Sequence, residues 1–286
     1  MPTRHMLSII YYDAIQRLNN IYKRVSSTSA TAPLSGYVHL LNQGNAIFIT
    51  DERQPYLVTI ESTLFHKLKT GDRLQARVTY NADSHNDIVS EIIDVQHVAY
   101  DDAPVVKSNR SLDLCGNTIN LGTSLLVHVE DNTDIVDKVD RIRRALPTDI
   151  TPILLSFDGR PTNFEIKTAY FTKPSYTSRE KLMTCLLAFF RAKQQADIGK
   201  NIVLIIDSLD KMFLTYNNCM QSAGTFNPNL FSSAAVMDFE NILCSSGNLK
   251  AGGSLTIIGL HHPGTSPQLL QINDRLHQIM DKVIKL

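Results

Sequence analysis

Residues 202–218 read IVLIIDSLDKMFLTYNN, and this stretch decides the fold. Five apolar residues run without interruption up to Asp207. An apolar run without polar alternation is typical of a strand that is buried on both faces, and such strands lie at the centre of parallel sheets. Asp207 then stands at the carboxyl end of the strand, where open α/β sheets place their ligand crevice. Two roles remain open for Asp207: it holds magnesium on bound phosphates, or it caps the following helix.

The composition is that of a folded globular protein, because 43% of the 286 residues are hydrophobic and 20% are charged. This length leaves room for two domains. No apolar run approaches the ~20 residues that a membrane helix needs, and the N-terminus lacks the apolar core of a signal peptide. The four cysteines are widely spaced without a CxxC pair, which favours reduced thiols over disulfides or zinc. We therefore expect a cytoplasmic protein that binds no membrane.

The first 33 residues are predicted to form a helix and a linker. Residues 6–25 place apolar side chains at close to helical spacing. The other side of this helix is basic through Arg17, Lys23 and Arg24, which is more typical of a solvated face than of a nucleic-acid arm. Residues 26–33, SSTSATAP, have the composition of a linker.

Residues 34–98 show short strands separated by turns, as in a small five-stranded β-barrel of the OB type. The expected strands are residues 36–41, 46–49, 56–60, 74–80 and 88–97. Barrels of this type bind single-stranded nucleic acid by stacking bases on aromatic side chains, and the candidates here are Tyr37, His39, Phe48 and Tyr56. Each of them, taken singly, is better explained as barrel core or ordinary surface. Residues 34–100 carry five basic and eight acidic residues, a net charge of −3, which is a poor footprint for nucleic acid.

A polar stretch at residues 99–110 marks the expected domain boundary, and after it strands alternate with helices. This alternation predicts an α/β domain with a parallel sheet over residues 110–286. The expected strands are residues 125–129, 153–157, 167–171, 202–206 and 254–260. The expected helices are residues 133–146, 178–196 and one that ends at residue 243, with a long loop at 217–235.

Several short blocks of this chain stand in an order and at a spacing that match one known family. They are Ile206-Asp207-Ser208 with Tyr216-Asn217, Ala223-Gly224, GGSLTII at residues 252–258, Asp113-Leu114, Asp158 with Arg160-Pro161, and Gly36, Gly44 and Thr70-Gly71-Asp72. In these blocks the chain resembles the family of the bacterial transcription termination factor Rho. Rho is a ring-shaped hexameric RNA helicase driven by ATP, and each subunit joins an OB barrel to a RecA-like ATPase domain. The resemblance implies this fold from about residue 36 to near the C-terminus.

The same resemblance marks where the chain departs from the family. The phosphate loop of Rho needs glycines for backbone approach, a lysine for the β/γ oxygens and a hydroxyl for magnesium. Residues 130–135 read EDNTDI here, so that Asp131 falls within a degenerate loop. Thr133 replaces the glycine, Asp134 the lysine, and Ile135 the magnesium hydroxyl.

Other positions of the family's ATPase set are changed too. The catalytic Glu falls at Gly159, and the chain ends before the family's arginine finger. Only Asp207 and Arg160 remain, and Asp207 alone is left to hold magnesium. We therefore expect no cofactor, although ATP and magnesium serve the family, and we expect no hexamer that ATP stabilises.

The RNA-contacting positions of the family are also replaced. The two phenylalanines of its second barrel strand are Asn45 and Ile47 here, and the pore-loop lysine is Gln268. Any binding of single-stranded RNA is therefore expected to be weak. The adjacent His261 and His262 suggest a metal site, but a histidine pair at a strand end is more often structural.

Three functions are compatible with these observations. The first is a Rho-like protein related to transcription termination that has lost ATP hydrolysis and acts through weak RNA binding, through Rho or through the transcription machinery. The second is a working RNA-dependent ATPase with an unorthodox site, and the third is a structural or assembly protein that keeps only the fold. The missing phosphate loop disfavours the second, and self-association is left open.

Overall fold

The structure is a computed structural model of the chain. It describes residues 32–41, 45–51, 57–60, 64, 67–81, 86–97, 110–130, 135–157, 169–221, 233–249, 252–262 and 267–285. The chain divides into two compact units, of which the second contains Val98–Leu286. The helix predicted within residues 6–25 lies outside the described residues, and so does the boundary predicted at 99–110 except for Arg110.

The N-terminal unit is built from five strands, and the expected five match them with ends that differ by up to two residues. They are β1 (Leu34–Leu41), β2 (Asn45–Thr50), β3 (Leu57–Ile60), β4 (Arg73–Asn81) and β5 (Asn86–Gln96). Their order is β1-β2-β3-β5-β4, and β4 pairs again with β1, so that the sheet closes. All neighbours are antiparallel except β3 and β5, which run parallel.

Two of the blocks that carry the resemblance to Rho have structural roles in this unit. A Cβ on Gly36 would lie 2.2 Å from the Ile49 carbonyl oxygen, so only glycine allows β1 and β2 to cross this closely. Gly71 has a φ of 93°, a conformation that favours glycine. Beside it the buried Asp72 carboxylate accepts a hydrogen bond from the Lys69 N–H at 2.7 Å. The Thr70 hydroxyl accepts one from the Leu40 N–H at 2.9 Å, which ties this turn to β1.

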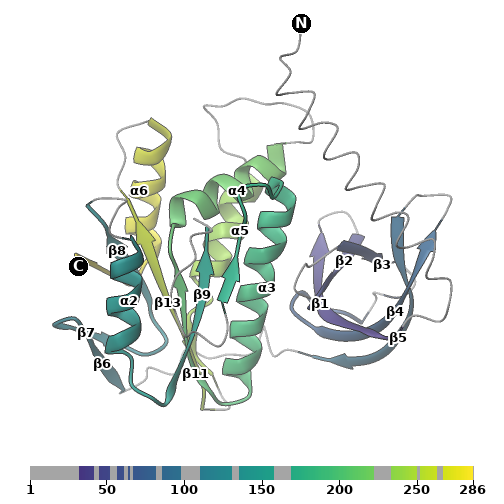
Figure 1. The fold of residues 1–286 in the computed structure, drawn as a ribbon, viewed down its shortest axis with the longest axis horizontal. Coiled ribbons are helices and arrows are strands. Elements are labelled where there is room, and N and C mark those ends of the chain that lie inside the picture. The colour runs from purple at the N-terminus through teal and green to yellow at the C-terminus, as the bar shows by residue number, and fades with distance from the viewer. Residues whose placement is uncertain are drawn as a thin grey trace, which may run out of the picture. The chain divides into compact units, whose positions relative to one another are not determined.

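The C-terminal unit contains a seven-stranded sheet, whose strands appear as arrows in Figure 1. The strands are β8 (Ser124–His128), β9 (Ile150–Ser156), β10 (Ala169–Phe171), β11 (Asn201–Ile206), β12 (Gly247–Asn248), β13 (Ser254–His261) and β14 (Lys282–Lys285). The order is β10-β9-β11-β13-β8-β14 with parallel neighbours, and β12 pairs antiparallel with β13. β11 lies between β9 and β13, which confirms a buried central strand at residues 202–206.

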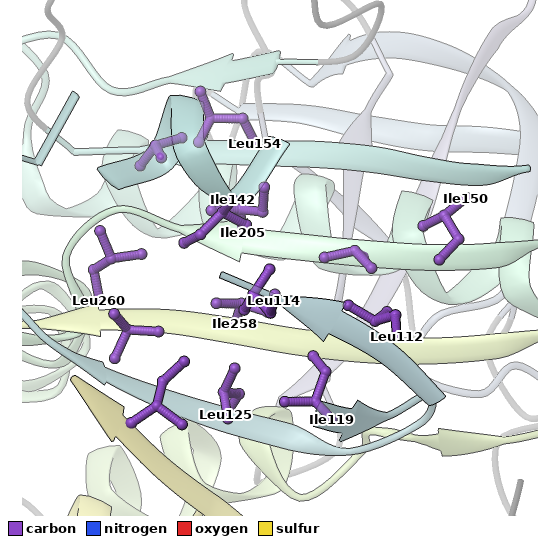
Figure 2. Packing of buried hydrophobic residues seen from close by; sticks show 14 of the residues in the cluster. Leu112, Leu114, Ile119, Leu125, Ile142, Ile150, Leu154, Ile205, Ile258 and Leu260 are labelled. Carbon is purple, nitrogen blue, oxygen red and sulfur yellow. The ribbon is translucent and has the colours of Figure 1, made fainter. Parts of the chain in front are cut away.

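One face of this sheet carries an apolar cluster that joins elements distant in sequence (Figure 2). Val203 and Ile205 of β11 contribute to it, together with Ile142 of α2 (Ile135–Ala145). Leu114 and Ile119 come from a separate hairpin of β6 (Ser111–Leu114) and β7 (Asn117–Asn120). Because successive strand residues point to opposite faces, this cluster uses every second residue of β11.

The other helices in the described part of the chain are α3 (Ser178–Asp197), α4 (Leu209–Gln221), α5 (Ser233–Leu243) and α6 (Pro267–Ile279). The loop predicted at residues 217–235 is wrong at both ends, since 217–221 belong to α4 and 233–235 to α5. The physical reason is packing: Phe239 lies with its ring centroid 5.0 Å from Phe213 and 6.4 Å from Tyr216. Within the described residues, every helix is too short or too polar to cross a membrane.

Candidate functional site

The site is the edge of the sheet where β8, β13 and β11 end side by side. Parallel neighbours place their carboxyl ends at one edge, and β13 pairs with both other strands. His262 directly follows β13 and Asp207 directly follows β11, while Glu130 stands two residues after β8. The predicted position of Asp207 at the carboxyl end of a central strand is thus the observed one.

Asp207 is buried, with 4% of its surface exposed, and β9 engages both of its carboxylate oxygens. The Ser156 hydroxyl donates to Oδ2 at 2.5 Å, and the Phe157 N–H donates to Oδ1 at 2.8 Å. The helix-capping contact at the start of α4 comes from the next residue instead, because the Ser208 hydroxyl accepts from the Lys211 N–H at 3.3 Å. Asp207 therefore joins the ends of β9 and β11.

The position expected for a magnesium hydroxyl is part of the apolar core. Ile135 is the first residue of α2, is 6% exposed, and belongs to the apolar cluster with Val139. Its neighbours in the predicted phosphate-loop segment, Asp131, Thr133 and Asp134, lie outside the described residues, and so does Arg160. Glu130, which precedes them, is exposed.

A polar network not predicted from the sequence lies at the same edge and centres on Asp210 in the first turn of α4. His261 Nδ1 is 2.7 Å from Asp210 Oδ1, within ion-pair distance but not aligned for a hydrogen bond. The His262 N–H donates to Asp210 Oδ2 at 3.2 Å, and His262 Nδ1 lies 3.0 Å from the Val129 carbonyl oxygen. On the other side His261 Nε2 is 3.1 Å from Asn273 Oδ1 of α6. These contacts join β8, β13, α4 and α6.

The histidine pair at residues 261 and 262 therefore has structural partners. Among the described residues, no three or more His, Cys, Asp and Glu side chains are grouped so as to hold a metal ion. Sequence reasoning identified the histidine pair but missed Asp210 and Ser156. The only signals were that Ser156 is the last residue but one of a predicted strand and that Asp210 follows another predicted strand by four residues.

Two of the aromatic side chains proposed for RNA stacking lie in the core of the N-terminal unit. Tyr37 and Phe48 are both 0% exposed. A base stacks only on a ring face that solvent can reach, so this placement argues against stacking on either ring. Tyr56 lies outside the described residues.

Comparisons with known proteins point in one direction. No family model matches the chain. Rho of Streptosporangium roseum is 30% identical over 112 residues, which are 39% of this chain and 27% of that protein. Rho 1 of Ehrlichia chaffeensis is 25% identical over 179 residues, 61% of this chain and 39% of that protein. The chain is distantly similar to Rho. The matched region spans well under half the length of these two relatives.

Solved structures extend this similarity to the fold. A prototypical ATPase from the type III secretion system of pathogenic bacteria has a TM-score of 0.57 at 16% identity, over 68% of this chain and 62% of that chain. The assembled ATPase EscN from the type III secretion system of enteropathogenic E. coli has a TM-score of 0.55 at 14% identity, over 90% and 72%. At these identities the likeness concerns the fold alone, which is the RecA-like α/β fold of these ATPases.

Proposed function

We propose that this chain is a Rho-like protein related to transcription termination that neither binds ATP with useful affinity nor hydrolyses it. It acts through weak RNA contacts or through protein partners such as Rho. The observation that carries the proposal is Ile135, a core side chain at the position where the family needs a magnesium hydroxyl. A buried isoleucine has no lone pair to offer a metal ion.

The charges around the same position oppose phosphate binding. The helix that begins at Ile135 offers a positive dipole end worth about 0.3–1 kcal/mol to an anion. Against it stand Glu130, Asp131 and Asp134. At ~4 Å and an effective dielectric of ~20, one pair of like charges costs about 4 kcal/mol, so repulsion outweighs the dipole. A Cβ on Thr133 also hinders the backbone from approaching phosphate oxygens.

The contacts of Asp207 also support a protein that does not hydrolyse ATP. Its two oxygens already accept hydrogen bonds from Ser156 and Phe157, which gives the residue a role without any metal. The family's catalytic carboxylate is replaced by Gly159. Even a magnesium ion held by Asp207 would therefore lack a residue to position the attacking water.

The N-terminal unit fits an OB-type barrel, because its strand order closes as β1-β2-β3-β5-β4 with β3 and β5 parallel. The burial of Tyr37 and Phe48 favours weak RNA binding or none. This burial is also what favours the second candidate, a structural or assembly protein that keeps the fold without contacting RNA.

The test is a calorimetric titration of the full chain with ATP and magnesium, run beside a phosphate-release assay. We expect no binding tighter than about 100 μM, roughly −5.5 kcal/mol, and no release. The triple variant Thr133→Gly, Asp134→Lys, Ile135→Thr should gain nucleotide affinity but not hydrolysis, because Gly159 remains.

A charge-matched control distinguishes a rebuilt phosphate loop from non-specific electrostatic attraction of ATP. It combines Thr133→Gly and Ile135→Thr with Asp137→Lys, which places the same new charge on an exposed residue of α2. This control should bind no better than the wild type. The proposal fails if the wild-type protein binds ATP more tightly than the stated limit, or if it releases phosphate and Asp207→Asn abolishes that release.

A further inference from the structure

Two histidines from distant parts of the chain meet at their ring nitrogens. His128 ends β8 and His277 lies in the last turn of α6, and their Nε2 atoms are 3.0 Å apart. Their rings are stacked at 29° with centroids 5.0 Å apart. The ring of His261 lies 5.6 Å from that of His128.

This contact depends on the number of protons that the pair holds. A hydrogen bond between two Nε2 atoms needs one donor and one acceptor. One proton between His128 and His277 therefore makes the contact attractive. When both rings are charged, both Nε2 atoms carry hydrogen, no acceptor remains, and two positive rings face each other.

The surroundings of His128 disfavour a second proton. Burial lowers the pKa of His128, and the nearby His261, His277 and Lys285 lower it further, while Asp210 raises it. The Asp210 carboxylate is already engaged by His261 and by the His262 N–H. The Nδ1 atom of His128 is buried without a hydrogen-bond partner in the described part of the chain, so a hydrogen there would be an unsatisfied donor.

The histidine pair is one of several contacts that hold α6 to the rest of the C-terminal unit. Asn273 binds β13, and Arg275 Nε lies 2.8 Å from Glu240 Oε1 of α5. Just beyond the helix, Asp281 accepts from the Ser124 N–H at 2.7 Å and from its hydroxyl at 2.9 Å. Of these contacts, the one between His128 and His277 links α6 to β8. Protonation of both rings turns this contact from attractive to repulsive.

We propose that His128 and His277 form a proton-operated latch, which holds α6 against β8 near neutral pH and releases it when both rings are protonated. The latch is independent of the proposed function, since it requires neither RNA nor nucleotide. It makes α6 and the edge strand β14 sensitive to acid.

Hydrogen exchange of the full chain tests the latch. Amides of α6 and β14 are compared at pH 7.5 and pH 5.5 in EDTA, after correction for the intrinsic exchange rate. We expect their protection to fall by several-fold, and by no more than about tenfold, at the lower pH, because release takes up one further proton, while amides of α3 in the same unit keep theirs. In His277→Gln, whose amide still hydrogen-bonds but does not titrate, this pH difference should disappear.

The control is Arg275→Gln on the same helix, which removes the contact with Glu240. It should reduce protection at both pH values and leave their ratio unchanged. A wild-type protein without the pH difference overturns the proposal, as does His277→Gln with the difference intact, since His261 would then be its source. Equal loss in α3 would mean global unfolding, and a difference seen only without EDTA would mean a bound metal ion. Either result overturns the latch as well.

Discussion

Gly252 and Gly253 stand side by side before β13 but face different constraints. A Cβ on Gly253 would lie 2.1 Å from the Ala196 carbonyl oxygen and 2.7 Å from the Lys200 carbonyl oxygen, both backbone atoms. Gly252 has a φ of +87° and open space around it. Packing at the end of α3 thus requires glycine at Gly253, and the positive φ favours glycine at Gly252, whatever the chain does with ATP.

We predict that Gly253→Ala destabilises the protein more than Gly252→Ala. The first change forces backbone atoms apart, and overpacking costs about 1–3 kcal/mol or more. The second adds a side chain in the left-handed region, which costs about 1–2 kcal/mol. Urea denaturation of both variants measures the difference, and a larger loss in Gly252→Ala would contradict the close backbone approach at Gly253.

At the scale of elements, the buried central strands were easier to predict than the elements that surround them. β11 and β13 have long apolar runs, because strands buried on both faces need apolar residues throughout. The hairpin of β6 and β7 was missed although Leu112, Leu114 and Ile119 alternate with exposed residues. Its turn has positive φ at Cys115 (53°) and Gly116 (86°), and cysteine is not a residue expected there.

Only those residues of the candidate site that directly follow a predicted strand could be predicted from the sequence. Asp207 terminates an apolar run, so its place at the edge could be foreseen. Its partner Ser156 is 51 residues away, and their contact depends on the register that pairs Ile206 with Leu155. Asp210 and Asn273 approach His261 from two helices, and helix placement on a sheet is decided by packing that no local pattern contains.

The link between β9 and β11 yields a prediction that does not depend on ATP. Asp207→Ala leaves the Ser156 hydroxyl and the Phe157 N–H without their acceptor, and a buried polar group left unpaired costs about 1–3 kcal/mol. We expect Asp207→Ala and Ser156→Ala each to lower the free energy of unfolding. Because the two side chains share one hydrogen bond, the double variant should lose less than the sum of the two. Chemical denaturation of the four proteins measures the coupling energy.

Asp210→Ala together with Ser156→Ala is the comparison pair, since none of the contacts described joins those two side chains. Their effects should add within about 0.3–0.5 kcal/mol. Additive effects of Asp207→Ala and Ser156→Ala would show that the bond between them does not stabilise the strand ends.

At the scale of the whole molecule, charge and burial bear on function more than the fold does. The chain carries 28 basic and 28 acidic residues, yet residues 34–100 hold five basic and eight acidic ones. A RecA-like fold is compatible with many activities, so function has to be argued from the site. In the correspondence with Rho proposed above, Asp134 falls where the family's phosphate loop needs a lysine, and residues 34–100 are acidic where an RNA-binding barrel is usually basic.

We therefore predict weak and strongly salt-dependent binding of pyrimidine-rich single-stranded RNA. Sub-micromolar affinity of the wild-type protein at physiological salt, measured by fluorescence anisotropy, would contradict this.

The variant Asn45→Phe, Ile47→Phe returns the two rings of the family's second barrel strand. One stacked base is worth about 1–3 kcal/mol, so the variant should bind at least tenfold more tightly. Its dependence on salt should stay as in the wild type, because no phosphate contact is added. The control, Gln75→Phe with Thr79→Phe, places two rings at exposed positions of β4. An equal gain in this control would mean that any exposed aromatic pair on the unit attracts RNA, and that the positions of Asn45 and Ile47 carry no special role.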